Sequence, residues 1–178
     1  FKDNYENALA TSYAIQSSTG ISVDLRNVME QVGKTTGSLR AQLNGSTEEI
    51  AEAVTNAEVL GMNLQTAADA GKALLDFESS IEKELEAELL TGKQLNLERA
   101  RAAALAGDQV TLQNELAANM GDFSDFSKMN VLQQESLAAA MGMNSDALSD
   151  ILFKQEIQGK TARELRALGK DELADRLE

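Results

Sequence analysis

Carboxylates are the only side chains of this sequence that gather densely enough to do chemistry. Six of them lie within thirteen residues, with Lys83 as the single basic residue between them: Asp76, Glu78, Glu82, Glu84, Glu86 and Glu88. Hard divalent cations bind carboxylates, but EF-hand spacing is absent and a helix would spread these side chains apart. Glycosidases use paired carboxylates beside aromatic sugar platforms, and the chain has no Trp. We interpret the run as a solvated helix face, with a basic protein surface as the alternative.

The sequence lacks the residues that most enzymes and metal proteins use. It has no Cys and no His, which excludes disulfides, zinc sites with such ligands, and Ser-His or Cys-His catalysis. We therefore predict that the chain is not an enzyme, and we assign it no catalytic residue, no metal ligand and no cofactor. A metal or small-molecule enzyme that uses carboxylates alone is the remaining alternative of that class.

The charge of the chain limits its partners. Asp and Glu number 29 against 16 Lys and Arg, a net charge of -13. DNA, RNA and anionic membranes are held by cationic surface, so we expect no sequence-specific nucleic acid and no membrane partner. The stretch from Leu137 to Leu148 has the sequence pattern of a helix-turn-helix. Its second helix would offer DNA two aspartates and Lys154 as its only cation, so we interpret this stretch as helix packing.

The elements that position these residues are predicted to be helices throughout. Pro is absent, and no alternating run predicts a strand. Glycines recur at the ends of apolar-periodic stretches, where a helix commonly stops: Gly45, Gly61, Gly92, Gly107, Gly121, Gly142, Gly159 and Gly169. Good N-cap residues follow, with capping-box patterns at Ser46–Glu49, Thr161–Glu164 and Asn130–Gln133. We predict an all-α array of short helices joined by Gly-terminated corners.

One long helix, over about residues 64–90, is predicted at the centre of this array. Apolar residues follow one another at helical spacing through it, and Gly71 inside it predicts a kink or a close helix crossing. Its apolar stripe and adjacent acidic face are our predicted protein-interaction residues: Leu74, Ile81, Leu85, Leu89, Glu78, Glu82 and Glu86. Five methionines near the turns are predicted to fill gaps in the core: Met62, Met120, Met129, Met141 and Met143.

The chain is divided into residues 1–45, an N-terminal helical segment, and residues 46–178, a helical module, although one continuous domain is the alternative. Further helices are predicted near residues 3–17, 23–32, 95–106, 110–120, 131–141, 146–157 and 162–168. No apolar stretch approaches the roughly 20 residues of a membrane helix. The chain begins at Phe1, so we expect it to be part of a longer protein.

Basic residues gather in two places. Lys93, Arg99 and Arg101 lie beside Glu98, and we interpret them as surface ion pairs. Near the end, basic side chains alternate with acidic ones: Arg163, Arg166, Lys170 and Arg176 with Glu164, Asp171, Glu172, Asp175 and Glu178. Surface ion pairs are again the simplest interpretation, and an interaction helix is the alternative.

Two stretches together resemble a known family. The first runs from Leu74 through Glu86-Ala87-Glu88-Leu89-Leu90-Thr91-Gly92 to Arg101. The second joins Lys128-Met129-Asn130-Val131-Leu132-Gln133-Gln134 to Leu137-Ala138-Ala139-Ala140-Met141-Gly142-Met143. They are similar to modules of tail tape measure proteins of tailed bacteriophages, and the resemblance covers roughly residues 50 to 158. These motifs are structural, not catalytic.

The resemblance implies a structural virion component that acts in tail assembly by helix packing inside the tail. It implies homo-oligomers, often trimers, which contact tail tube and baseplate proteins, a place in the tail lumen, and assembly in the host cytoplasm. A measuring rod would be one uninterrupted helix, whereas glycines interrupt this chain every 10 to 20 residues. We therefore expect a folded helical module. A cytoplasmic adaptor or scaffold that binds basic proteins through its acidic face is the alternative.

Overall fold

The computed structural model describes residues 25–34 and 47–159, together with six single helical positions between residues 6 and 16. This part of the chain contains nine helices and no strand, so the all-α prediction is confirmed. The helices are α2 (Leu25–Lys34), α4 (Thr47–Val59), α5 (Leu64–Leu75), α6 (Phe77–Thr91), α7 (Glu98–Ala106), α8 (Gln109–Met120), α9 (Phe123–Lys128), α10 (Val131–Ala140) and α11 (Ser145–Gly159).

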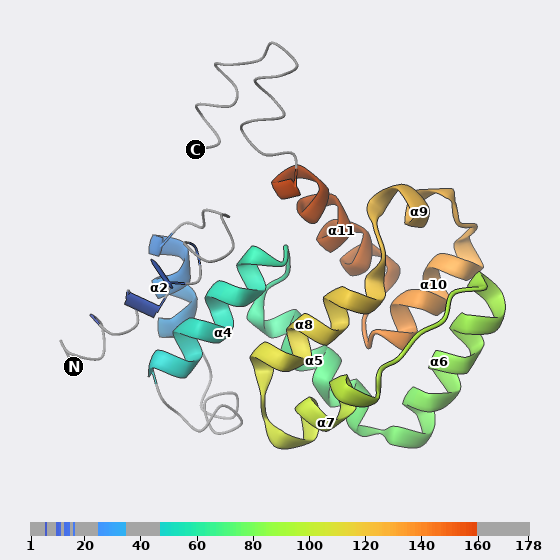
Figure 1. Cartoon of the computed structure of the whole chain (residues 1–178), viewed down its shortest axis with the longest axis horizontal. Helices are drawn as coiled ribbons and strands as arrows, with labels where there is room; N and C mark the ends of the chain where they lie inside the picture. Colours follow the sequence, from blue (N-terminus) through green and yellow to red (C-terminus); the bar gives the residue numbers. More distant parts are fainter. Residues whose placement is uncertain are drawn as a thin grey trace, which may run out of the picture.

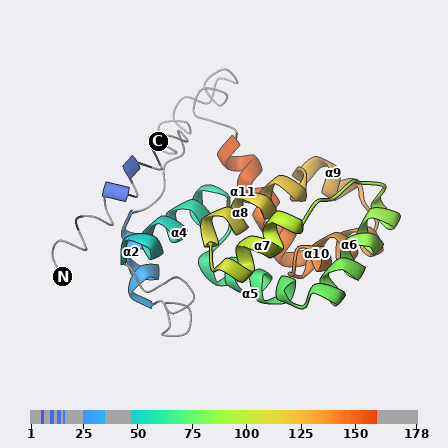
Figure 2. The ribbon, with the colours of Figure 1, turned by 60° about the horizontal axis from the view of Figure 1, so that its bottom comes forward.

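The helices form an elongated array with α2 and α4 at one end and α6 and α10 at the other (Figure 1). A view turned by 60° keeps these two ends apart (Figure 2). The main core is built from small and aliphatic side chains of α5, α7, α8, α10 and α11, and its largest fully buried members include Leu74, Leu112, Leu116, Leu137, Leu148 and Leu152. A second cluster joins Val28 and Val32 to Ile50 and Val54. The predicted boundary between residues 45 and 46 lies outside the described residues.

Close approach of backbones compensates for the small side chains of this core. A Cβ added to Gly71 would lie 2.8 Å from Leu112 Cδ2, so α5 crosses α8 at the point where α5 has no side chain. At the α10–α11 corner, Gly142 has φ of 76°, and an added Cβ would lie 2.8 Å from the backbone oxygen of Ala70. Of the two alternatives predicted at Gly71, a kink or a close helix crossing, the structure shows the close crossing.

The predicted long helix over residues 64–90 is wrong. The chain leaves helical geometry at Asp76, where φ is -78° and ψ is 81°, and two helices result. Asp76 caps the second of them, because its Oδ1 accepts a hydrogen bond from the Ser79 backbone N–H at 3.4 Å. The two segments thus have separate helix axes, and the apolar spacing that runs across the break does not form one continuous face.

Other helix boundaries lie within a few residues of their predicted positions. The capping box at Asn130 is confirmed: its Oδ1 accepts from Gln133 N–H, and Gln133 Oε1 accepts from Asn130 N–H, both at 2.9 Å. The predicted capping patterns at residues 46–49 and 161–164 each include residues outside the described part of the chain, as does the predicted helix at 162–168. The six-residue α9 was not predicted. Met120 and Met141 are fully buried and Met62 is nearly so, as expected of core methionines.

Candidate functional site

The outer face of α6 exposes apolar side chains in a single line. Phe77, Ile81, Leu85 and Leu89 follow one another at intervals of four residues, and we call them the α6 stripe. Their exposed fractions are 43 %, 46 %, 56 % and 86 %. Scattered exposed apolar residues are normal on protein surfaces, but a line of four along one helix is typical of a surface that a partner covers.

A line of glutamates runs beside this stripe. Glu78, Glu82 and Glu86 also repeat every four residues, each one position after a residue of the α6 stripe, and all three are exposed. We call them the glutamate row. None of them belongs to the ion pairs found among the described residues. The three predicted apolar contacts Ile81, Leu85 and Leu89 therefore lie next to the three predicted acidic contacts, on one surface of one helix.

Leu74 does not belong to this surface, and its prediction as an interaction residue is wrong. Its side chain is 1 % exposed and lies in the main core. The reason is the break at Asp76: Leu74 lies on α5, whose apolar face is covered by the rest of the molecule. The exposed apolar line begins instead with Phe77, the first residue of α6.

The inner face of α6 carries two buried polar side chains, Ser80 and Glu84, beside the buried Ala87. Glu84 is buried and forms an ion pair with Arg101 of α7, whose Nε donates to Ser80 Oγ at 2.9 Å. Glu84 Oε1 also accepts from the backbone N–H of Leu97 at 3.0 Å. Glu84 is not part of a solvated face, because α7 and the α6–α7 linker cover it, and Arg101 is not a surface cation, because it neutralises Glu84.

The linker between α6 and α7 is also held to α8. Asn119 of α8 accepts from Asn96 N–H at 2.8 Å through its Oδ1, and its Nδ2 donates to the Asn96 carbonyl at 3.0 Å. Arg99 of α7 forms an ion pair with Glu115 of α8 at 3.3 Å, and the Arg99 side chain is exposed, as predicted for a surface ion pair. Together with the buried and satisfied Glu84–Arg101 pair, these exposed contacts hold α6, α7 and α8 in one arrangement.

The end of α6 is joined to the start of α10. Gln133 Nε2 donates to the Leu90 carbonyl at 2.9 Å, which places the first turn of α10 against the last turn of α6. Val131 and Leu132, which begin α10, are 66 % and 67 % exposed. These two residues were missed as surface candidates. The sequence carried no signal for their exposure, because the face of α10 that packs on α6 is decided by contacts between distant residues.

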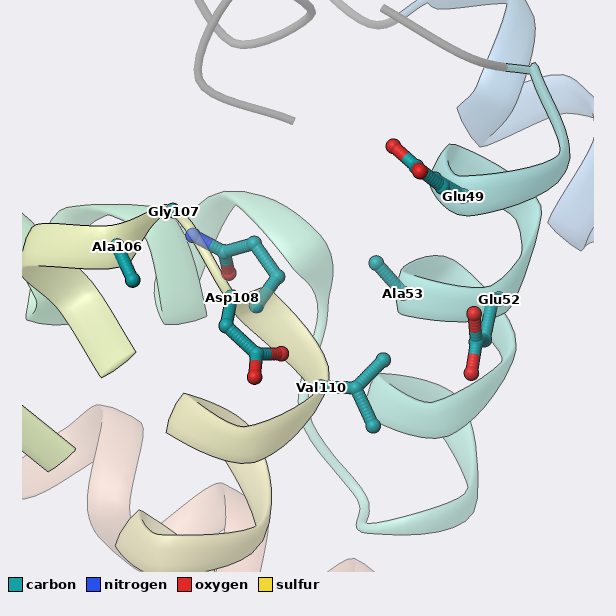
Figure 3. A pocket seen from close by; sticks show the side chains of 8 residues that line it. Glu49, Glu52, Ala53, Ala106, Gly107, Asp108 and Val110 are labelled. Carbon is teal, nitrogen blue, oxygen red and sulfur yellow. The ribbon is translucent and has the colours of Figure 1, made fainter. Parts of the chain in front are cut away.

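A separate hollow lies between α4 and the turn from α7 to α8, with a volume of about 270 Å³. The carboxylates of Glu49 and Glu52 lie on one side of it and Asp108 on the other (Figure 3). Asp108 is the N-cap of α8, because its Oδ1 accepts from the Thr111 backbone N–H at 3.2 Å, and its Oδ2 accepts from Thr111 Oγ1 at 2.6 Å. Within the described residues, no group of three or more Asp or Glu side chains is placed to hold a metal ion.

The described part of the molecule is thus an all-α protein whose most distinctive surface is an apolar line beside an acidic one. No family model matches the chain, and neither the characterised proteins nor the solved structures contain a significant match. In the described residues, no helix is both long enough and apolar enough to cross a membrane.

Proposed function

We propose that this chain is a structural module that works by helix packing, as part of a tail tape measure protein of a tailed bacteriophage. The observation that carries the structural role is the α6 stripe, because burial of exposed apolar area is the main favourable term in protein association. Phage tail membership comes from the sequence resemblance over residues 50 to 158. In this role the partners are sister chains and tail proteins, and the chain performs no chemical step.

A first experiment tests association through the α6 stripe. The full chain is studied by size-exclusion chromatography with light scattering, beside a variant with Leu85→Gln and Leu89→Gln. We expect a defined oligomer for the unmodified chain and a shift to monomer for the variant, because two exposed leucines are lost from the interface. The matched control is Leu105→Gln, which changes a leucine of α7 that is 70 % exposed. A monomeric unmodified chain, or equal loss in the control, would contradict the proposal.

A second experiment tests the location. Mass spectrometry of purified phage particles and isolated tails should detect peptides from this sequence in the tail fraction. Their absence from tails, with the protein found only in the host cytoplasm, would favour the adaptor. The observation that favours this second candidate is the glutamate row, since three exposed carboxylates without an ion pair in the described structure suit a basic protein surface.

A further inference from the structure

The hollow between α4 and the α7–α8 turn gathers hydrogen-bond acceptors without a cation to match them. Three carboxylates line it, those of Glu49, Glu52 and Asp108, and none of the described residues around it is basic. Glu49 interacts with another residue, whereas the Glu52 side chain forms no hydrogen bond or ion pair with the described part of the chain. Asp108 bonds Thr111, but a carboxylate accepts about four hydrogen bonds and so keeps further capacity.

A buried amide in the same hollow is a second, independent sign of a ligand. Gln109, the first residue of α8, lines the hollow and is 7 % exposed, and its Oε1 accepts no hydrogen bond. It also borders a second hollow lined by Lys72, but no hydrogen bond joins the two residues. Buried polar atoms are usually paired, because an unpaired one costs free energy. This oxygen therefore needs an N–H donor from outside the described residues.

The chemistry of the hollow favours a guanidinium group over a metal ion. Within the described residues, no three acidic side chains are placed to share a metal ion. A guanidinium is larger, and its five N–H donors form a planar fork that reaches acceptors lying farther apart. Figure 3 shows Ala53 and Val110 between the carboxylates of α4 and Asp108, where they suit the methylene stem of an arginine. The volume of about 270 Å³ is also smaller than the roughly 300–1,000 Å³ of sites for drug-sized ligands.

The helix ends at the hollow add to its negative field. Helix α7 ends there, with Gly107 as its C-cap, and the carbonyl end of a helix favours cations. The N-terminus of α8 has the opposite sign, but its N-cap is Asp108, whose carboxylate offsets it. Fixed charge and backbone dipoles thus both suit a cation.

We infer that this hollow binds a guanidinium group, supplied by an arginine side chain of a partner protein. The guanidinium donates to Glu52, Asp108 and Gln109, and its stem lies over Ala53 and Val110. The last torsion of a glutamine is broad, so the Gln109 amide turns its Oε1 to the ligand. Other helices than α6 form this hollow, so the inference goes beyond the proposed function and does not depend on the α6 stripe.

A titration of the isotope-labelled full chain, followed by nuclear magnetic resonance, tests the site. The probe is N-acetyl-arginine amide, and its matched control is N-acetyl-citrulline amide, which has the same shape without the charge. We expect saturable shifts at the backbone amides of Ala53, Gly107 and Val110, with a Kd on the order of 1 mM, for the arginine probe alone. Equal shifts with both probes, or equal shifts at the glutamate row, would overturn the inference, because they would mean binding without recognition of a guanidinium at this hollow.

Two variants remove one acceptor each. Glu52→Gln and Gln109→Leu should each weaken binding of the arginine probe roughly three- to fivefold, which is what one partly exposed charged contact contributes. Gln109→Leu should not lower the Tm, because it removes an oxygen that is buried without a partner. Glu135→Gln is the matched control: it makes the same change in charge at an exposed position of α10 and should bind the probe normally. Normal binding by both site variants, with circular dichroism showing that they are folded, would contradict the inference.

Free arginine, used as a third probe, distinguishes the two sources of a guanidinium. A partner's arginine has no charges at its backbone, so we expect the capped probe to bind at least as tightly as free arginine, whose carboxylate meets the acidic hollow. Tighter binding of free arginine would overturn the assignment to a partner protein and make the hollow a site for a small guanidinium compound.

Discussion

Helices α5 and α6 are consecutive and similar in length, yet they use their apolar residues in opposite ways. Over twelve residues, α5 buries Leu64 and Leu74 together with Gly71 and three alanines. Over fifteen residues, α6 buries only Ser80, Glu84 and Ala87, and its larger apolar side chains are exposed. The first helix is therefore held by its hydrophobic face, whereas the buried face of the second joins Ala87 to Ser80 and to the ion pair of Glu84.

A helix can therefore be fixed in a fold while its large hydrophobic side chains stay exposed. A buried ion pair is usually no more stabilising than apolar packing in the same space, but it specifies geometry. On α6 it also leaves the aliphatic side chains available to a partner. A helix held by apolar contacts, as α5 is, has no such surface to offer.

The largest effect on stability is expected from the buried ion pair that joins Glu84 of α6 to Arg101 of α7. Arg101→Ala leaves the buried carboxylate of Glu84 without its partner, and we expect the free energy of unfolding to fall by about 3–5 kcal/mol. Urea denaturation followed by circular dichroism measures this loss. Arg99→Ala is the matched control, because Arg99 pairs with Glu115 at the surface, and it should cost about 0–1 kcal/mol. Equal losses in the two variants would mean that the buried pair does not hold α6.

The next largest effect is expected when a leucine of α5 and a leucine of α6 are each replaced by alanine. Leu74→Ala on α5 should lower the free energy of unfolding by about 2–5 kcal/mol, because it leaves a cavity in the main core. Leu85→Ala on α6 should change it by no more than about 0.5 kcal/mol. Both are measured by urea denaturation at protein concentrations low enough to keep the chain monomeric. A large loss for Leu85→Ala under these conditions would show that the α6 stripe belongs to the fold.

The boundary between these helices shows where sequence reasoning succeeds and where it stops. Helix type and the Asn130 capping box were predicted, because each depends on residues close in sequence. A glycine inside a helical stretch marked Gly71 as a kink or a crossing, but the sequence did not indicate Leu112 as the residue that it meets. The break at Asp76 was not, since no Gly or Pro marks it and the apolar spacing continues through it. Asp76 itself, a good N-cap residue followed by Glu78 in the first turn, was the available signal.

The orientation of α6 depends on contacts between distant residues. Nothing near Glu84 in the sequence distinguishes it from Glu82 or Glu86; its burial is decided by Arg101, seventeen residues later. Three of the four predicted apolar contacts nevertheless lie on the α6 stripe, because spacing within one helix is preserved once its start is known. Leu74 was assigned incorrectly because the start of that helix was misplaced.

The smallest effect on stability is expected from the N-cap residues with which α5 and α6 begin. Asn63 caps α5 from extended geometry, with its Oδ1 accepting from Thr66 N–H at 2.7 Å, whereas the corresponding bond of Asp76 at α6 is 3.4 Å long. We expect Asn63→Ala to cost about 1 kcal/mol and Asp76→Ala about 0.5 kcal/mol or less, because a long capping bond contributes little. Urea denaturation of the two variants measures the difference. If Asp76→Ala costs more than Asn63→Ala, the turn at Asp76 is itself a stabilising element, and the position of α6 is decided at its start as well as by the Glu84–Arg101 pair.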